Sequence, residues 1–337
     1  MSESTLQNTL WNPDHLESVE ACPFCQSTER SLAHKGVRDW CFWQAPGAWD
    51  FYDCRRCRSI YLDPRPTEAS IGLAYANYYT HEQPSSFASR IKDRLKNEVY
   101  SELLGLDVRP RILPSRLVQK LVTKFLGQSV SKPFGFELLG SLPKGKFLDI
   151  GCGSGVIVRF AQQLGWDAMG IDLDPVAVSK ARAAGLNVRQ GSPADIPSYG
   201  QVFDCIMCCH VLEHVHDPIQ MLQTLKSALK PTGTLFLVLP NSQSGLREYF
   251  GENWRGLEAP RHLQIPSQLG LTKLLAEMGF KVKIIHNSSA PTAAESFRIK
   301  RRDRTVTRDD VHKAAELGNR LTEDPNRGDF IGLYLSF

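Results

Sequence analysis

Short apolar runs alternate with helix-like stretches from Lys144 to the end of the chain. The apolar runs predict strands, and apolar residues spaced three or four positions apart predict helices. This alternation is typical of a parallel sheet with helices packed on its faces. The expected strands are Lys146–Ile150, Ala168–Ile171, Val188–Gln190, Phe203–Cys209, Thr234–Leu239, Lys281–Ile285 and Phe330–Phe337.

Capping residues mark the ends of the helices expected between these strands. Ser267 can accept a hydrogen bond at the start of one helix, and Gly279 can end it. Residues 230–233 (Lys-Pro-Thr-Gly) are expected to form a turn that stops the helix before the fifth strand. The expected helices are Val156–Leu164, Pro175–Ala184, Pro218–Leu229 and one capped by Ser267 that runs to Met278.

Four cysteines form two close pairs, Cys22 with Cys25 and Cys54 with Cys57, separated by 28 residues. Each CxxC pair lets two thiolates reach one ion, and two pairs complete the tetrahedron that zinc prefers. The alternatives are two CxxC turns that are unrelated to each other, or a CxxC pair with a redox role. Four thiolates leave no open coordination position, so we predict a structural zinc ion.

Composition suggests four parts in the chain. We expect a flexible tail over residues 1–20, a zinc ribbon over 21–80, a helical linker or cap over 81–140 and the main domain over 141–337. The linker is basic and amphipathic, which is typical of helices that cover a neighbouring domain. A nucleic-acid-binding face is the alternative for these helices.

The charge balance and the lengths of the apolar runs limit the partners and the cellular location that we expect for this protein. The 337 residues include 40 Lys and Arg against 36 Asp and Glu, and a net charge of +4 is too mild to imply a nucleic-acid partner. No apolar run approaches the roughly 20 residues of a membrane span, and the acidic start lacks the features of a secretory signal. We therefore expect a cytoplasmic protein with no membrane partner.

The segment Phe147–Gly155 is a strand that breaks into three glycines at the start of a helix. Glycines let the backbone approach a ligand, and a helix start offers free N–H groups. Asp172 closes the next strand, where a carboxylate can accept both ribose hydroxyls. Val156 stands where a dinucleotide fingerprint needs Gly or Ala, and Asp149 would repel a pyrophosphate. Asp149 instead suits a cofactor with ammonium and sulfonium charges, such as S-adenosylmethionine.

These motifs resemble those of class I S-adenosylmethionine-dependent methyltransferases, over residues 148–155 (LDIGCGSG), 170–172 (GID), 210–215 (HVLEHV) and 229–233 (LKPTG). Residues 254–257 (WRGL) and 260–263 (PRHL) further resemble a bacterial subgroup that has N-terminal CxxC pairs. That subgroup is associated mostly with small-molecule methyl transfer. The resemblance implies an α/β fold with a Rossmann-like seven-stranded methyltransferase sheet, helices on both faces, an antiparallel last strand and a small N-terminal zinc ribbon.

The resemblance also implies how the cofactor is held. Asp149 and the first two glycines would surround the methionine part, Asp172 the ribose, and the end of the fourth strand the reactive methyl group. Relatives commonly place an Asp against adenine after the third strand; Ser192 stands at that position here and Asp195 lies three residues on, so both remain candidates. The expected cofactor-binding residues are Asp149, Gly151, Cys152, Gly153, Asp172, Leu173, Ser192, Asp195 and His210.

A hydroxyl acceptor must lose its proton during methyl transfer, and histidine is the usual base near neutral pH. We expect the catalytic residue to be one of His210, His214 and His262, with His216 as a further candidate. A packed structural histidine is the alternative for each. The long segment 240–266, which contains His262, is expected to be a substrate lid.

Two further groups of residues have plain structural interpretations. Cys205, Cys208 and Cys209 are expected to be buried side chains that pack in the core on the fourth strand. Lys300–Arg304 is expected to be a solvated charge run between the last two strands.

We therefore predict an enzyme that transfers a methyl group from S-adenosylmethionine to a small metabolite, such as a sugar, secondary-metabolite or quinone-like acceptor. Oxygen is the expected attacking atom. One alternative is an RNA methyltransferase that recruits RNA with its zinc ribbon. Another is a non-catalytic module that binds S-adenosylmethionine. A nucleic-acid partner is disfavoured because residues 209–212 (CHVL) replace the Asn/Asp-Pro-Pro-Tyr/Phe motif often used for base methylation.

Overall fold

The computed structural model describes residues 10–75, 136–285, 290–321 and 324–337, with short pieces between residues 95 and 124. Residues 1–9 of the predicted tail and most of the predicted linker lie outside the described residues. Residues 10–20 are described, and the prediction of a flexible tail is wrong for them, because they form η1 (Pro13–His15) and β1 (Leu16–Glu17) and bury the Trp11 side chain. Within the linker, residues 97–102 are helical, as is α4 (Phe136–Ser141).

The chain divides into two compact units. The first unit comprises residues 1–78, 208–223 and 235–337, and the second comprises 79–207 and 224–234. Strands β9 and β10 contribute residues to both units.

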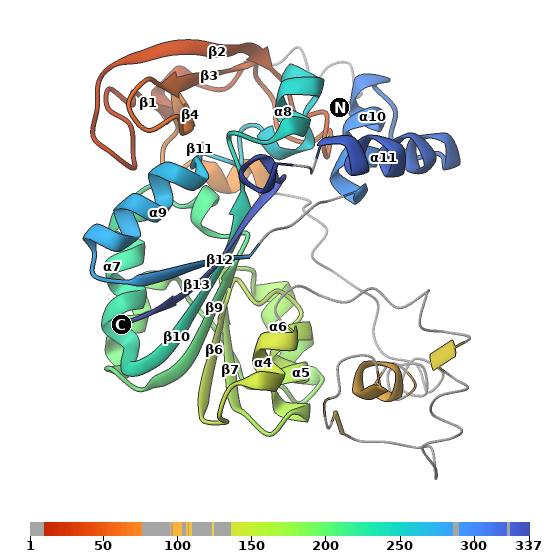
Figure 1. The fold of residues 1–337 in the computed structure, drawn as a ribbon. Helices are drawn as coiled ribbons and strands as arrows, with labels where there is room; N and C mark the ends of the chain where they lie inside the picture. The colour runs from red at the N-terminus through yellow and green to blue at the C-terminus, as the bar shows by residue number, and fades with distance from the viewer. Residues whose placement is uncertain are drawn as a thin grey trace. The chain divides into compact units, whose positions relative to one another are not determined.

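Seven strands form one mixed sheet in the order β12, β13, β10, β9, β6, β7, β8 (Figure 1). Neighbouring β6, β7 and β8 run parallel, whereas β13 runs antiparallel to both β10 and β12. The predicted Rossmann-like sheet with an antiparallel last strand is confirmed. Its strands are β6 (Lys146–Ile150), β7 (Asp167–Asp172), β8 (Val188–Gln190), β9 (Phe203–Cys209), β10 (Leu229–Pro240), β12 (Lys281–Ile285) and β13 (Phe330–Ser336).

The helices predicted between the strands are present, with ends within one residue of the predicted ones. Asp174 caps α6 by accepting a hydrogen bond from the Val176 N–H, and Ser267 caps α9. These helices are α5 (Val156–Gln163), α6 (Pro175–Ala183), α7 (Pro218–Ala228) and α9 (Gln268–Glu277). Among the described residues, no helix is long and apolar enough to cross a membrane.

The predicted turn over residues 230–233 is wrong, because β10 already begins at Leu229. The Lys230 ammonium group lies 2.8 Å from both carboxylate oxygens of Asp204 on β9. A Cβ on Gly233 would lie 2.9 Å from the carbonyl oxygen of Phe203, so the backbones approach closely. These contacts hold the Pro-Thr-Gly stretch in extended backbone along β9.

Two helices between β12 and β13 were not predicted: α10 (Ala290–Lys300) and α11 (Arg308–Leu321). Among the described positions of α11, only Asp310, Ala314 and Leu317 are buried, so most of this helix faces solvent. The charge run Lys300–Arg304 links the two helices. Its Lys and Arg side chains are exposed, as predicted.

The N-terminal part forms a second sheet, of four strands in the order β11, β4, β3, β2, and a small pair of β1 with β5. Strand β11 comes from far along the chain, and Gln264 and Ile265 pair with Tyr61 and Ile60 of β4. The strands are β1 (Leu16–Glu17), β2 (Arg30–Val37), β3 (Trp49–Cys54), β4 (Ile60–Leu62), β5 (Arg65–Pro66) and β11 (Gln264–Ile265).

The segment 240–266, which we expected to be a substrate lid, thus contributes a strand to this sheet, and its role as a lid stays a prediction. Besides β11 it contains α8 (Gly245–Phe250), and its Trp254 side chain is only 1% exposed. The Trp254 indole N–H donates to Asp329 at 2.9 Å. A large buried aromatic residue fixes the segment within the first unit.

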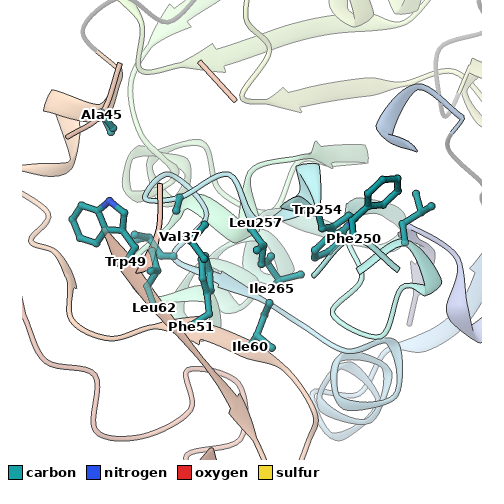
Figure 2. Close-up of a cluster of buried hydrophobic side chains, with 14 of the residues drawn as sticks. Val37, Ala45, Trp49, Phe51, Ile60, Leu62, Phe250, Trp254, Leu257 and Ile265 are labelled. Carbon is teal, nitrogen blue, oxygen red and sulfur yellow. The ribbon is translucent and has the colours of Figure 1, made fainter. Parts of the chain in front are cut away.

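One hydrophobic cluster joins the ribbon strands to the later segments of the first unit. Figure 2 shows Phe51 and Leu62 of the ribbon, and the same cluster includes Trp254, Leu257 and Ile265. The ribbon thus shares its core with residues more than 180 positions away in sequence, because a ribbon of this size cannot bury enough apolar surface alone.

Gly155 offers a test of the packing behind the glycine-rich turn. Its φ is +80°, and a Cβ there would lie 2.5 Å from Cδ1 of Leu186. Gly165 has φ +91° with open space around the same position, so it is the matched control. Left-handed backbone costs an L-residue about 1–2 kcal/mol, and overpacking costs about 1–3 kcal/mol more.

We expect Gly155→Ala to lower the free energy of unfolding by about 2–5 kcal/mol and Gly165→Ala by only about 1–2 kcal/mol. Urea titrations of both variants measure the difference. Equal losses would mean that Leu186 moves aside without cost.

Candidate functional site

The chain passes from β6 into α5 through three glycines in left-handed backbone. Gly151, Gly153 and Gly155 have φ values of +68°, +52° and +80°. Side chains other than glycine rarely adopt this conformation. No side chain of the described residues caps α5, so its N-terminal N–H groups can serve a ligand.

Asp172 ends β7 beside this turn. One carboxylate oxygen accepts the Gly153 N–H at 2.7 Å, and the other accepts the Asp174 N–H at 2.8 Å. Each carboxylate oxygen can accept a second hydrogen bond. The side chain therefore ties the turn to the end of β7 and keeps the capacity to accept two hydroxyl groups.

Asp149 lies in β6 directly before the turn and is 2% exposed. Its Oδ2 atom has no hydrogen-bond partner in the part of the chain that the structure describes. Burial, and then the negative charge of Asp172, raises the pKa of Asp149 to about 8. A buried carboxyl with an unpaired oxygen favours a cationic ligand, because a positive charge offsets the cost of ionising it. The ammonium-bearing methionine part of S-adenosylmethionine fits this requirement.

Ser192 and Asp195, the two candidates for adenine, cap the same short helix, η4 (Pro193–Tyr199). The Ser192 hydroxyl accepts the Ala194 N–H at 3.2 Å, and the Asp195 carboxylate accepts the Ser192 N–H at 2.7 Å. A Cβ on Gly191 would lie 2.7 Å from that carboxylate. The two residues thus hold each other at the end of β8.

Two further predicted cofactor residues flank the turn and the end of β7. Cys152 is buried, and a Cβ on Gly170 would lie 2.5 Å from its sulfur. Leu173 follows Asp172 and is 68% exposed, an unusual position for a large apolar side chain.

His210 follows β9 and belongs to the first unit. Its φ is +56°, and its N–H donates to the Val238 carbonyl at 2.7 Å. The side chain is 46% exposed, and its Nδ1 lies 3.3 Å from Oε1 of Glu213. Left-handed backbone at a non-glycine residue costs energy and is common at functional sites.

Glu213 is fully buried in the turn that follows. Burial by itself would raise its pKa, but the hydrogen bond from His210 and the nearby rings of His214 and His262 lower it overall. Among the described residues, its Oε2 atom has no hydrogen-bond partner. An ionised, buried carboxylate thus sits among three histidines.

His214 and His262 lie against each other, with ring centroids 4.7 Å apart. Nδ1 of His214 is 3.0 Å from the carbonyl oxygen of Arg261, and Nδ1 of His262 is 2.7 Å from that of Gly256. The Tyr75 hydroxyl also lies 3.0 Å from Nδ1 of His214. Burial lowers the pKa of His262 to about 4, so this ring is neutral near pH 7.

Buried ionic groups that the sequence did not reveal surround these rings. Arg261 is fully buried and donates two hydrogen bonds to Asp39, at 3.1 and 2.8 Å. Arg255 pairs with the buried Glu258. Burial would raise the pKa of Glu258, but Arg255 and then His262 lower it to about 2. The sequence did contain a sign of this cluster, because residues 254–263 include two arginines, one glutamate and one histidine.

The four ribbon cysteines converge on one point. The Sγ atoms of Cys22 and Cys57 are 3.5 Å apart, and those of Cys25 and Cys54 are 3.4 Å apart. A tetrahedral zinc–thiolate site requires sulfur separations of about 3.8 Å, given bonds of about 2.3 Å. The four side chains therefore form a cluster that could hold a metal ion.

The remaining candidates lie elsewhere. Nε2 of His216 is 2.9 Å from the carbonyl oxygen of Pro66, which is an ordinary structural contact. Cys205 and Cys208 are buried on β9, as predicted. Among the described residues, neither they nor Cys209 belong to a group that could hold a metal ion.

The raised pKa of Asp149 predicts how stability depends on pH without cofactor. The folded carboxyl keeps its proton up to about pH 8, whereas the unfolded one loses it near its ordinary pKa of 3.8. The folded state thus binds more protons in this window, so its stability falls as pH rises from about 4 to about 8.

We expect Asp149→Asn to remove this component of the pH dependence, as measured by urea unfolding at several pH values. Asp167→Asn, at the exposed start of β7, is the control and should leave the profile unchanged. A profile that Asp149→Asn does not alter would contradict the assigned pKa.

Comparison with known proteins identifies the family of this chain. Residues 114–283 match the family described as a methyltransferase domain. A ubiquinone biosynthesis O-methyltransferase from Xanthomonas campestris pv. campestris (strain B100) is 38% identical over 104 residues, 29% of this chain and 44% of that protein. One from Actinobacillus pleuropneumoniae serotype 7 (strain AP76) is 32% identical over 134 residues, 36% of this chain and 53% of that protein.

The chain thus spans about half the length of the curated relatives it matches. Among solved structures, a SAM dependent methyltransferase from Archaeoglobus fulgidus aligns with a TM-score of 0.43 and 18% identity, over 65% of this chain and 94% of that one. The family match extends over half of the chain and includes the glycine-rich turn and Asp172. The chain therefore belongs to the class I S-adenosylmethionine-dependent methyltransferases.

Proposed function

We propose that this protein transfers a methyl group from S-adenosylmethionine to a hydroxyl group of a small metabolite. The observation that carries the proposal is the glycine-rich turn joined to Asp172 within the matched family segment. When bound, the cofactor supplies a methyl group already activated by its sulfonium charge. The chain then has to align the acceptor, exclude water and accept one proton.

The residues of the second unit would bind the donor. Asp149 would face the ammonium group, and the N–H groups of Gly151 and Gly153 would contact the methionine part. Asp172 would accept the ribose hydroxyls. For adenine we favour Asp195 over Ser192, because a carboxylate accepts a hydrogen bond from an amino group and the Ser192 N–H already fixes its orientation. Cys152 and Leu173 would supply apolar contacts.

We assign His210 as the general base. It is half-exposed and can meet an acceptor, whereas His262 is 5% exposed and His214 is packed between His262 and Tyr75. Because Glu213 accepts a hydrogen bond from Nδ1, the His210 tautomer leaves Nε2 free to take the acceptor's proton. Relatives named O-methyltransferases support oxygen as the attacking atom.

We further propose that the four-cysteine cluster holds a structural zinc ion. One Sγ atom from each of the four cysteines lies within 4.8 Å of the others, and two CxxC pairs supply the four ligands of the tetrahedron that zinc prefers. Four thiolates this close together would repel one another, and a divalent cation offsets that repulsion.

Asp172→Ala should weaken cofactor binding about 10- to 100-fold, since hydrogen bonds to a charged group contribute about 1.5–3 kcal/mol. Calorimetric titration with S-adenosylhomocysteine measures this affinity. Asp167→Ala, on the same strand, is the control and should bind as the wild type does. Zinc content should remain unchanged in both variants, and unaltered affinity in Asp172→Ala would remove this residue from the ribose site.

The function itself is tested with S-adenosylmethionine that carries a labelled methyl group. Purified protein is incubated with a cell extract, which is then separated into metabolite, RNA and protein fractions. We expect label in the metabolite fraction, reduced about 10²- to 10⁴-fold by His210→Gln and unchanged by His312→Gln on the exposed face of α11. Label in RNA would overturn the small-molecule proposal, and no label in any fraction would favour a binding module.

A further inference from the structure

We propose that a surface of the first unit, between the loop joining β2 to β3 and the link joining α10 to α11, binds the phosphate group of a small metabolite. Four side chains form this tryptophan–arginine patch: Trp40, Trp43, Arg302 and Arg304. The Arg302 guanidinium carbon lies 4.5 Å from the ring centre of Trp40, and that of Arg304 lies 5.5 Å from the ring centre of Trp43. The two indole rings meet edge to face, with centroids 4.8 Å apart. Two cationic groups thus share one aromatic platform.

A buried arginine joins the two sides of the patch. Arg298 is 4% exposed, and its guanidinium group donates to the carbonyl oxygens of Trp40 and Cys41 at 3.2 and 3.1 Å. The same group donates to the carbonyl oxygen of Asp303 at 2.8 Å. Arg298 therefore fixes the loop after β2 against the link after α10. A site that is assembled in advance loses less entropy when a ligand binds.

The positive charge of Arg302 forms no ion pair with any residue that the structure describes. Its Nη1 atom donates to neutral oxygens, at 2.6 Å to Oδ1 of Asn253 and at 2.7 Å to a backbone carbonyl. Burial of part of the side chain lowers the pKa of Arg302, and the charge of Glu252 offsets this only in part. Arg301, the preceding residue, pairs instead with two aspartates. A cation without a counter-charge favours an anionic ligand.

Trp43 gives a second, independent indication. Its indole Nε1 atom is buried and has no acceptor in the described part of the chain, and a buried donor without an acceptor costs free energy. An oxygen atom of an anion held by Arg304, which covers the same ring, could accept this N–H. Trp43 and Arg302 also have left-handed backbone, with φ values of +60° and +58°. Such backbone costs energy at residues other than glycine and is common at ligand-binding sites.

The charges indicate the class of ligand. A guanidinium group matches the oxygens of phosphates and carboxylates alike, but a phosphate monoester carries a charge of about −1.5 to −2 near pH 7 and can balance both arginines of the patch. Acidic side chains border the patch, because Asp303 stands between the two arginines in sequence and Glu252 is close enough to affect Arg302. These carboxylates would repel the further phosphates of a nucleic acid. The patch therefore favours a single phosphate group on a small molecule.

Equilibrium dialysis of the full-length, zinc-loaded protein against labelled inorganic phosphate tests the patch. We expect one phosphate to bind per chain. Acetate should compete at least about tenfold less well than unlabelled phosphate, because it can form a charge-assisted hydrogen bond to only one arginine at a time. A protein that binds no phosphate at millimolar concentrations would overturn the proposal. Equal competition by acetate would overturn the choice of phosphate as the ligand.

Variants locate the bound phosphate. Arg302→Gln and Arg304→Gln should each weaken its binding about 10- to 100-fold, the usual effect of losing a hydrogen bond to a charged group. Arg189→Gln is the matched control and should bind as the wild type does, because Arg189 is also exposed and also lies over an aromatic ring, but belongs to the second unit. Zinc content and the urea unfolding midpoint show that a variant is folded, and if Arg302→Gln unfolds, Arg304→Gln decides. Equal phosphate affinity in all three variants would overturn the site.

A single-stranded oligonucleotide tests the other source of phosphate. We expect it to bind no more tightly per phosphate group than inorganic phosphate does. Tight binding that weakens steeply with salt and is lost in Arg302→Gln would assign the patch to nucleic acid and overturn the small-molecule inference. None of these measurements depends on methyl transfer. A chain that transfers label but binds no phosphate would overturn this inference alone, and a chain that binds phosphate but transfers no label would overturn only the proposed function.

Discussion

The first unit depends on the buried ion pair between Arg261 and Asp39. Arg261 donates two hydrogen bonds to Asp39 and a third to the carbonyl of Ala74, and no part of its side chain reaches solvent. Asp39 also accepts backbone N–H groups from Phe42, Gln44 and Ala45. Removing one partner of such a pair costs about 3–5 kcal/mol, because the other charge is left buried and unpaired.

This pair also positions the histidines. The Arg261 carbonyl accepts a hydrogen bond from His214, and the next residue along the chain is His262. The ribbon loop that carries Asp39 therefore fixes the backbone that orients two rings of the candidate site. The N-terminal ribbon also has a structural role, because its loop supplies the counter-charge for a segment more than 200 residues away in sequence.

The candidate functional residues of the two units are positioned by different kinds of interaction. In the second unit, backbone conformation dominates: three left-handed glycines and one carboxylate at a strand end form the candidate donor site. Short motifs can specify such a site because all of its parts lie at the ends of adjacent parallel strands. In the first unit, buried charges dominate, and the pKa values of Glu213, Glu258 and His262 depend on burial and on the charged side chains around them.

The sequence by itself determined the seven-stranded sheet, the helices that follow its strands, the glycine-rich turn with Asp172, and the two cysteine pairs. Hydrophobic periodicity and fixed spacings encode these features locally. The tertiary structure alone decided that residues 240–266 pack into the core of the first unit, that α10 and α11 stand before the last strand, and that Asp39 meets Arg261. Burial, tautomers and ion pairs depend on which distant side chains share a low-dielectric environment, and no local pattern specifies that.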